Sequence, residues 1–225
     1  MRLDPACLPD EIERRSFEII DAEISPGRRP PGRLWDVARR CVHACGDTGI
    51  LEDLLLEEAG LERGVAALKK GCAIFTDTRM LAAGLVERRM GRLGASPLPL
   101  MGIPGVEEKA RAWGCTRSKA GIRMIADKLA GAIVAIGNAP TALLGLLGEL
   151  QGIDASLGPA LIVGMPVGFV NAAQSKELLC QSPWPKFVLR GRKGGSAIAA
   201  AAVNALAELA LQGLSAQAGL IGKRL

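Results

Sequence analysis

The chain contains one histidine, His43, so any chemistry that needs an imidazole must use it. Imidazole is a frequent general acid or base in enzymes because its charge changes near neutral pH. His43 precedes Gly46, a glycine that predicts the end of a helix. A helix end favours the protonated ring, whereas the neighbouring Arg39 and Arg40 disfavour it. His43 is therefore a candidate proton donor, and the alternative from residue type alone is a hydrogen-bonded structural histidine.

Three loops rich in glycine and proline could bind anions. They span residues 137–141, 164–168 and 191–196, and each follows an apolar run and precedes a helical pattern. Free amides at a helix start, together with small residues, suit carboxylates or phosphates. The last loop adds Arg190, Arg192 and Lys193, whereas each loop alone is also compatible with ordinary turn chemistry. None matches GxGxxG or GxxxxGK[ST], so neither a dinucleotide nor a nucleoside triphosphate is implied.

Three further polar residues are candidates for ligand contact. Arg117 follows Thr116, the predicted N-cap of a helix, where a cation is unfavourable unless an anion or a surface salt bridge compensates it. Ser16 lies in an otherwise charged and apolar helix, where an exposed or back-bonded serine is the simpler interpretation. Arg39 lies four residues before His43 and so shares its helix face.

Helices predominate before the first strand. Residues 10–23 predict an amphipathic helix capped by Asp10, and residues 25–33 predict a loop. A second helix ending near Gly46 has an apolar stripe, and the segment 54–71 continues the helical pattern. The stripe consists of Trp35, Ala38, Val42 and Cys45.

The rest of the chain alternates between strands and helices. Residues 72–77 predict a buried strand, residues 85–102 suggest extended chain and turns, and two helices follow. Then a continuous apolar run, a turn and a helix recur three times, which is typical of a parallel sheet covered on both faces. We expect a single domain over residues 1–225. Its fold class is α/β, with a doubly wound, mostly parallel sheet flanked by helices and an N-terminal helical addition.

Composition narrows the classes of partner. The net charge of +5 favours an anionic ligand, but three Trp, four Phe and no Tyr leave little to stack on bases, so nucleic acid is not expected. No run reaches the roughly 18 apolar residues of a membrane span, and the N-terminus lacks an apolar signal region, so we expect a cytoplasmic protein without membrane contact. Six cysteines without a CxxC pair predict neither a metal site nor disulfides.

The sequence resembles the precorrin-8X methylmutase and cobalt-precorrin-8 methylmutase family over about residues 11–207. Residues 85–105 and the tail after 207 match less closely. The likeness is carried, in order and spacing, by RSFEII (15–20), VHACG (42–46), GCTRS (114–118), AIGNAPTAL (135–143), GMPVGFV (164–170) with Ser175-Lys176, and RGRKGGS (190–196).

This resemblance implies an isomerase of vitamin B12 biosynthesis that moves a methyl group from C11 to C12 of a corrin precursor, precorrin-8X or cobalt-precorrin-8. It implies a homodimer, no cofactor and no bound metal. His43 would protonate the macrocycle, cationic side chains would hold its acetate and propionate groups, and Met165 and Val167 with Phe169 would form apolar walls. The substrate-binding residues would be Ser16, Arg39, Thr116, Arg117, Asn138, Met165, Val167, Arg190, Arg192, Lys193 and Ser196.

Two other classes of function remain open at this point. A non-catalytic corrinoid or tetrapyrrole carrier would use the same anion-binding loops and an apolar cleft. A nucleotide-dependent oxidoreductase would share the fold pattern, but the missing glycine fingerprint counts against it.

Overall fold

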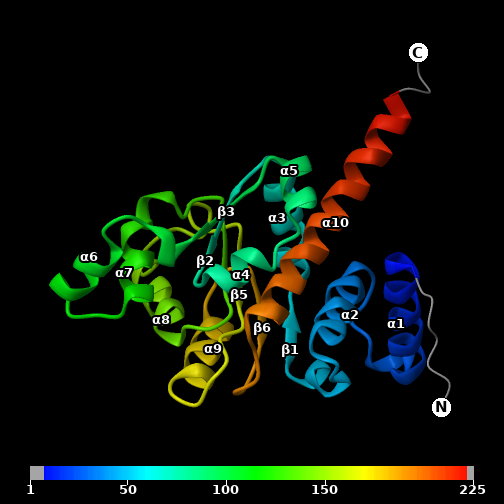
Figure 1. Cartoon of the computed structure of the whole chain (residues 1–225), viewed down its shortest axis with the longest axis horizontal. Helices are drawn as coiled ribbons and strands as arrows, with labels where there is room; N and C mark the ends of the chain where they lie inside the picture. Colours follow the sequence, from blue (N-terminus) through cyan, green and yellow to red (C-terminus); the bar gives the residue numbers. More distant parts are fainter. Residues whose placement is uncertain (1–7, 222–225) are drawn as a thin grey trace.

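The computed structural model describes residues 8–221 as a six-stranded sheet with helices on both faces (Figure 1). The strands are β1 (Leu54–Leu56), β2 (Ala73–Thr76), β3 (Ser96–Pro99), β4 (Ile133–Ile136), β5 (Leu161–Gly164) and β6 (Lys186–Leu189). The helices are α1 (Pro9–Glu23), α2 (Arg33–Cys45), α3 (Glu58–Lys69), α4 (Arg79–Ala83), α5 (Glu87–Leu93), α6 (Val106–Ala112), α7 (Arg117–Met124), α8 (Pro140–Glu149), α9 (Ala172–Gln181) and α10 (Ser196–Ile221). The predicted α/β fold with a mostly parallel sheet is confirmed.

The sheet has the order β1-β6-β5-β4-β2-β3. All neighbouring strands are parallel except β1, which runs antiparallel to β6. From β2 the chain passes to β3 on one side, and it then returns to β4 on the other side of β2. This reversal is a topological switch point, the place where open parallel sheets usually bind ligands at the carboxyl ends of their strands.

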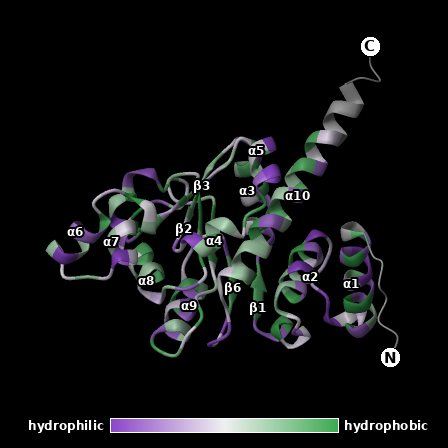
Figure 2. Ribbon diagram, viewed as in Figure 1, coloured by the Kyte–Doolittle hydropathy of each residue, from purple (hydrophilic) through white to green (hydrophobic). Residues whose placement is uncertain are grey.

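Side chains of the central strands alternate between two apolar cores. In β4, Ile133 and Ala135 belong to one core and Val134 and Ile136 to the other, and all four are fully buried. The first core is covered by α2, α3, α5 and α10, and the second by α7, α8 and α9. Burial on both faces explains why β4 and β5 carry no charged or polar side chain along their whole length. The surrounding helices, such as α1 and α2, carry both hydrophobic and hydrophilic residues (Figure 2).

The C-terminal helix α10 is the longest of the helices that cover the first core. By length and composition alone the segment Ser196–Ser215 could cross a membrane, but 61% of its most apolar window is buried inside the protein. Its apolar side chains instead belong to the first core, together with those of the strands and of α2, α3 and α5. Such burial is typical of the core helix of a globular protein.

Three local predictions were wrong. Residues 54–56 form β1 rather than the start of a helix, because pairing with β6 satisfies their backbone groups. Asp10 does not cap α1, which begins one residue earlier, at Pro9, after an N-cap at Leu8. The segment 85–102 contains the helix α5 as well as the expected extended chain in β3.

Other predicted helix ends are confirmed. Gly46 ends α2 in the left-handed conformation, with φ 65°. Thr116 caps α7, its hydroxyl accepting a hydrogen bond from the backbone N–H of Lys119 at 3.2 Å. Gly46 ends the helix that contains His43, and Thr116 caps the helix that begins with Arg117, so both ends position candidate site residues.

Candidate active site

The carboxylate of Asp77 joins the loops that follow β2 and β4 at the switch point. Its side chain is almost completely buried, at 1% exposure, and accepts hydrogen bonds from the backbone N–H groups of Gly137 (3.1 Å), Asn138 (2.7 Å) and Ala139 (2.6 Å). Burial raises the pKa of this carboxyl group, and the three N–H donors oppose the rise. Because these amides precede α8, Asp77 fixes the start of that helix against β2.

The loops after β4, β5 and β6 are in backbone contact. A Cβ atom added to Gly137 would lie 2.7 Å from the Cα of Ser196, and one added to Gly194 would lie 2.2 Å from the carbonyl oxygen of Met165. The hydroxyl of Ser196 is 3.1 Å from that of Thr78, the N-cap of α4. The three loops singled out in the sequence therefore lie together at one edge of the sheet.

An ion pair holds the end of α2 beside this edge. The ammonium group of Lys193 donates to the carboxylate of Asp47 at 2.6 Å, and this hydrogen bond lowers the pKa of Asp47 and raises that of Lys193. Asp47 directly follows Gly46, the C-cap of α2. The last turn of α2, which contains His43, is thereby fixed next to the loop 190–195.

His43 is exposed in the last turn of α2. Its ring packs edge to face on Phe17 of α1, with ring centroids 5.5 Å apart and planes at 71°. The guanidinium groups of Arg39 and Arg40 lie over the same Phe17 ring, at 4.5 and 5.2 Å from its centroid. Among the described residues, no hydrogen bond engages the imidazole, so its nitrogens are available to a ligand.

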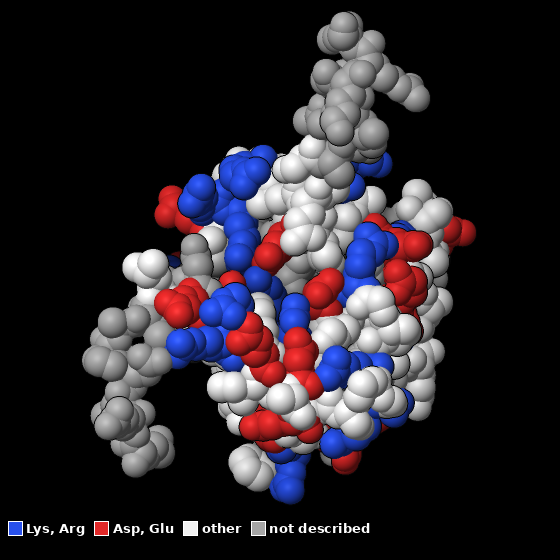
Figure 3. Space-filling view, turned by 90° about the vertical axis from the view of Figure 1, so that its right-hand side faces the viewer, with Lys and Arg blue, Asp and Glu red and all other residues white. Residues whose placement is uncertain are grey.

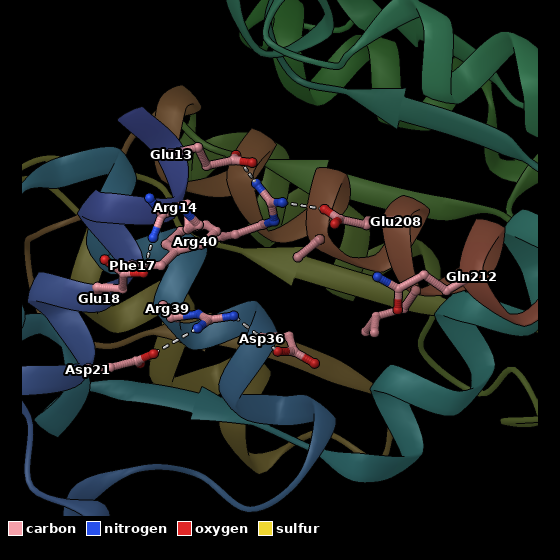
Figure 4. Close-up of a pocket in the computed structure, with 12 residues that line it drawn as sticks. Glu13, Arg14, Phe17, Glu18, Asp21, Asp36, Arg39, Arg40, Glu208 and Gln212 are labelled. Atoms are coloured by element: carbon pink, nitrogen blue, oxygen red, sulfur yellow. Dashed lines mark hydrogen bonds and ion pairs between the residues drawn. The ribbon is translucent and has the colours of Figure 1, made fainter. Parts of the chain in front are cut away.

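Next to His43, a cavity of about 530 Å³ lies between α1, α2 and α10 (Figure 4). Its charged lining consists of Glu13, Arg14, Glu18, Asp21, Asp36, Arg39, Arg40 and Glu208. The carboxylates bind the guanidinium groups: Arg39 contacts Asp21 at 2.9 Å, and Arg40 bridges Glu13 and Glu208. Figure 3 shows acidic and basic side chains side by side on this face. With more carboxylates than arginines, this cavity does not suit a polyanion.

Of two predicted contact residues, Arg39 lines that cavity, and Ser16 directly precedes Phe17, which also lines it. The hydroxyl of Ser16 donates to the carbonyl oxygen of Ile12 at 2.8 Å, the back-bonded arrangement. Arg39 is engaged by Asp21 and, more distantly, by Asp36 at 3.5 Å. Both residues lie beside Phe17, which supports the His43 ring.

Thr116 and Arg117 lie at the start of α7, close to α8. The hydroxyl of Thr116 donates to that of Thr141 at 2.9 Å, which joins the two helix starts. Arg117 is 60% exposed and forms an ion pair with Glu107 at 2.8 Å. A protein carboxylate thus occupies the place beside Arg117 where the sequence suggested an anion.

The remaining predicted residues lie at the carboxyl edge. Asn138 and Arg192 are exposed, Arg192 lies over the Phe169 ring at 5.1 Å, and Arg190 is 3.5 Å from Glu177. Val167 is 42% exposed, as an apolar wall requires.

Met165 does not fit the role of an apolar wall. Its side chain is completely buried in the first core, so it supports the loop from beneath. Its backbone joins two neighbouring segments, because its N–H donates to Ile136 at 2.8 Å and its carbonyl accepts from Gly195 at 3.0 Å. The predicted role was wrong because the chain turns after β5 so that this side chain points inward.

Comparison with known proteins identifies the family. The family model described as CbiC, precorrin-8X methylmutase, matches residues 11–209. The chain belongs to the precorrin-8X methylmutase family. Members of this family are isomerases, so the predicted class of enzyme is confirmed. The matched segment includes the carboxyl-edge loops, α2 and nearly all of α1.

Relatives within the family cover nearly the whole chain. A precorrin-8X methylmutase of Sinorhizobium sp is 41% identical over 87% of this chain and 92% of its own length. A cobalt-precorrin-8 methylmutase of Priestia megaterium is 34% identical over 92% of this chain and 91% of its own length. The solved structure of a precorrin-8X methylmutase from Thermus thermophilus superposes with a TM-score of 0.81, at 38% identity, and covers 90% of this chain and 96% of that one.

Three residues of the candidate site were not predicted as site residues from the sequence: Asp77, Asp47, and Lys176, whose ammonium group donates to the carbonyl oxygen of Lys193. Asp77 closes a predicted strand, Asp47 follows a helix stop, and Lys176 appeared only within a family-like motif. An acidic residue directly after a buried strand was an available signal for Asp77. No local signal exists for Asp47 and Lys176, since their partners lie 146 and 17 residues away along the chain.

We predict that Asp77→Ala lowers the free energy of unfolding by roughly 3 kcal/mol, because three amides lose their acceptor and a buried unpaired group costs about 1–3 kcal/mol. Urea denaturation measures the change. The matched control is Asp154→Ala, which removes an exposed carboxylate that accepts from the backbone N–H of Ser156 and should leave the midpoint nearly unchanged. Equal midpoints for the two variants would contradict the role of Asp77.

Proposed function

We propose that this chain moves a methyl group from C11 to C12 of precorrin-8X or cobalt-precorrin-8, giving hydrogenobyrinic acid or cobyrinic acid. The Lys193–Asp47 ion pair is the observation that carries the proposal, because it brings the helix of His43 to the cationic carboxyl-edge loops. A proton donor beside an anion-binding edge suits a reaction on a polycarboxylate macrocycle. Relatives at 34 and 41% identity carry the names of both substrates.

In this mechanism His43 is the general acid. The substrate and product are isomers: the bond from C11 to the methyl carbon breaks and the bond from C12 forms, with no net oxidation. Protonation of the macrocycle by the imidazolium of His43 redistributes charge for the migration, and the macrocycle then returns one proton to the neutral ring, so the imidazolium is regenerated. No cofactor is required for this balance. A positioned general acid contributes typically 10²–10⁴-fold, so orientation of the macrocycle must supply the remainder.

The substrate carboxylates are proposed to bind along the carboxyl edge. Arg190, Arg192 and Lys193 supply charge there, and the exposed Asn138 before α8 supplies a polar side chain. Ser196 at the start of α10 is buried, and its hydroxyl contacts Thr78, so it supports this edge from beneath. The protein carboxylates that hold the cations are exposed, and exposed ion pairs are weak. A substrate carboxylate can therefore replace Glu177 at Arg190 at little cost, while the three donors of Lys193 allow it to bind a further carboxylate and keep its pair with Asp47.

The apolar part of the macrocycle needs a wall that excludes water. Val167, Phe169 and Val170 are 42, 82 and 78% exposed on the loop before α9. Ser16 and Arg39 contribute indirectly in this proposal, through Phe17 and the orientation of His43. Thr116 and Arg117 bind a further substrate carboxylate at the start of α7.

We further propose that the enzyme works as a homodimer in the cytoplasm. His43 and the apolar residues Phe169 and Val170 are too exposed in one chain to keep water from a large ligand, and a second copy would cover them. Cys41, Cys45, Cys72, Cys115 and Cys180 are free, which suits a reducing compartment. Cys7 lies outside the described residues.

The activity is tested by mixing the protein with precorrin-8X, or with its cobalt form, under anaerobic conditions. We expect the absorption spectrum to convert to that of the product at substoichiometric protein, from a preparation that sediments as a dimer of the 23.5 kDa chain. A spectral change that saturates at one equivalent of protein, with the substrate recovered unaltered, would instead identify a corrinoid carrier.

We predict that His43→Ala folds and binds the corrinoid but loses at least about a hundredfold in kcat, the magnitude expected of a general acid. Circular dichroism, spectral titration and turnover measure the three properties. Cys45→Ala is the matched control, because its side chain lies in the same helix turn and bonds only to nearby backbone oxygens. A kcat near the wild-type value in His43→Ala would show that His43 is not the general acid.

We predict that Arg117→Ala raises KM about tenfold or more, as expected for the loss of a charged contact of roughly 1.5 kcal/mol. Glu107→Ala distinguishes substrate binding from structure, since it breaks the same ion pair but keeps the guanidinium. Only Arg117→Ala should weaken binding. Equal increases in KM for both variants would show that Arg117 acts through its pair with Glu107.

A further inference from the structure

Lys176 of α9 is a buried lysine beside the candidate site. Its relative exposure is 0%, and its ammonium group donates to the carbonyl oxygen of Lys193 at 2.7 Å. Among the described residues, no carboxylate lies within ion-pair distance of it. Burial lowers the pKa of Lys176 to about 8, although Asp53, Cys180 and Glu177 act in the opposite direction.

A second buried lysine shows how the same fold accommodates such a group. Lys186, at the start of β6, is 5% exposed, but it forms an ion pair with Glu57 at 3.0 Å and donates to the carbonyl oxygens of Ser182 and Trp184. Lys176 lacks a comparable set of partners. A methionine would fill a similar volume without the cost of burying charge, so the lysine serves something other than stability.

The carbonyl that Lys176 binds belongs to the loop between β6 and α10. Lys193 pairs with Asp47 through its side chain, and Arg192, one residue earlier, lies over Phe169. The carbonyl of Arg192 accepts from Gly168 at 3.1 Å. By donating to the carbonyl oxygen of Lys193, Lys176 fixes the peptide that directly follows these two cationic residues.

We propose that Lys176 is a positioning residue that holds the loop 190–195 so that Arg192 and Lys193 face the substrate carboxylates. This inference rests on the proposed function for the identity of the ligand that the loop binds. The order of the loop itself can be measured without substrate. Lys176 touches no reacting atom, so its loss should affect binding and leave the chemical step intact.

Hydrogen exchange tests the order of the loop directly. In Lys176→Met we expect the amides of residues 190–195 to exchange about tenfold faster than in the wild type at the same pH, with the remainder of the sheet unchanged. Lys186→Met is the matched control and should alter exchange only near Glu57 and the end of α9. If Lys176→Met does not fold, Lys176→Leu, which also removes the N–H donor, replaces it. Unchanged exchange in the loop would overturn the proposal whether or not the enzyme turns over corrinoid.

Kinetics separate positioning from general destabilisation. We expect Lys176→Met to raise KM about tenfold with kcat within about threefold, whereas Lys186→Met lowers stability without changing KM. Wild-type KM should also rise between pH 7 and 9 as Lys176 loses its proton among Asp53, Glu177, Cys180 and Arg190, and this rise should be absent from Lys176→Met. A KM of Lys176→Met equal to that of the wild type at pH 7 would overturn the proposal. An inactive wild type would instead refute the proposed function.

The same pKa shift has a consequence for stability. The pKa of Lys176 is about 8 in the folded protein and near its ordinary value of 10.5 in the unfolded chain. Between these two pH values the folded protein therefore binds fewer protons than the unfolded chain. Stability therefore rises with pH between about 8 and 10.5 relative to Lys176→Met, and the full cost of burial is present below 8. Urea denaturation of both proteins at pH 7 and 10 measures this difference, which vanishes if Lys176 titrates normally.

Discussion

The buried carboxylate of Asp77 is the interaction on which the candidate site depends. A parallel sheet places the starts of several helices at one edge, and the amides there have no partner within their own helices. Asp77 binds three of these amides at the switch point, and Thr78, one residue later, caps α4 and contacts Ser196 at the start of α10. With these groups satisfied, the loops pack backbone to backbone and the functional side chains point outward.

Charge is used in two ways in this molecule. In the cavity between α1, α2 and α10, arginines and carboxylates neutralise one another and join helices (Figure 4). At the carboxyl edge, the pairs of Arg190 and Lys193 are exposed, and such pairs hold a side chain in place yet are weak. Arg190 can therefore exchange Glu177 for a ligand carboxylate, whereas Lys193 and the arginines of the cavity must keep their partners to hold the helices.

Some side chains near the candidate site are unfavourable for the stability of the chain. Lys176 is buried without an ion pair, and Phe169 and Val170 expose large apolar surfaces to water. His43 also lies at the surface, where no hydrogen bond from the described residues orients its ring. The buried charge and the exposed apolar side chains are unfavourable in the isolated chain, as expected where function limits stability. Under the proposed function, a bound ligand would cover the exposed ones.

The sequence by itself determined the elements whose signals are local. Continuous apolar runs followed by glycine and proline predicted β4, β5 and β6 with their helices, Gly46 and Thr116 marked helix ends, and the family-like motifs identified the family. Tertiary structure decided what depends on distant partners. The three residues of β1 are a strand only because β6 pairs with them, and Met165 lies in the core because of the turn after β5. Asp77, Asp47 and Lys176 act through groups on other elements, and burial and hydrogen bonding between separate segments exist only after the sheet has formed.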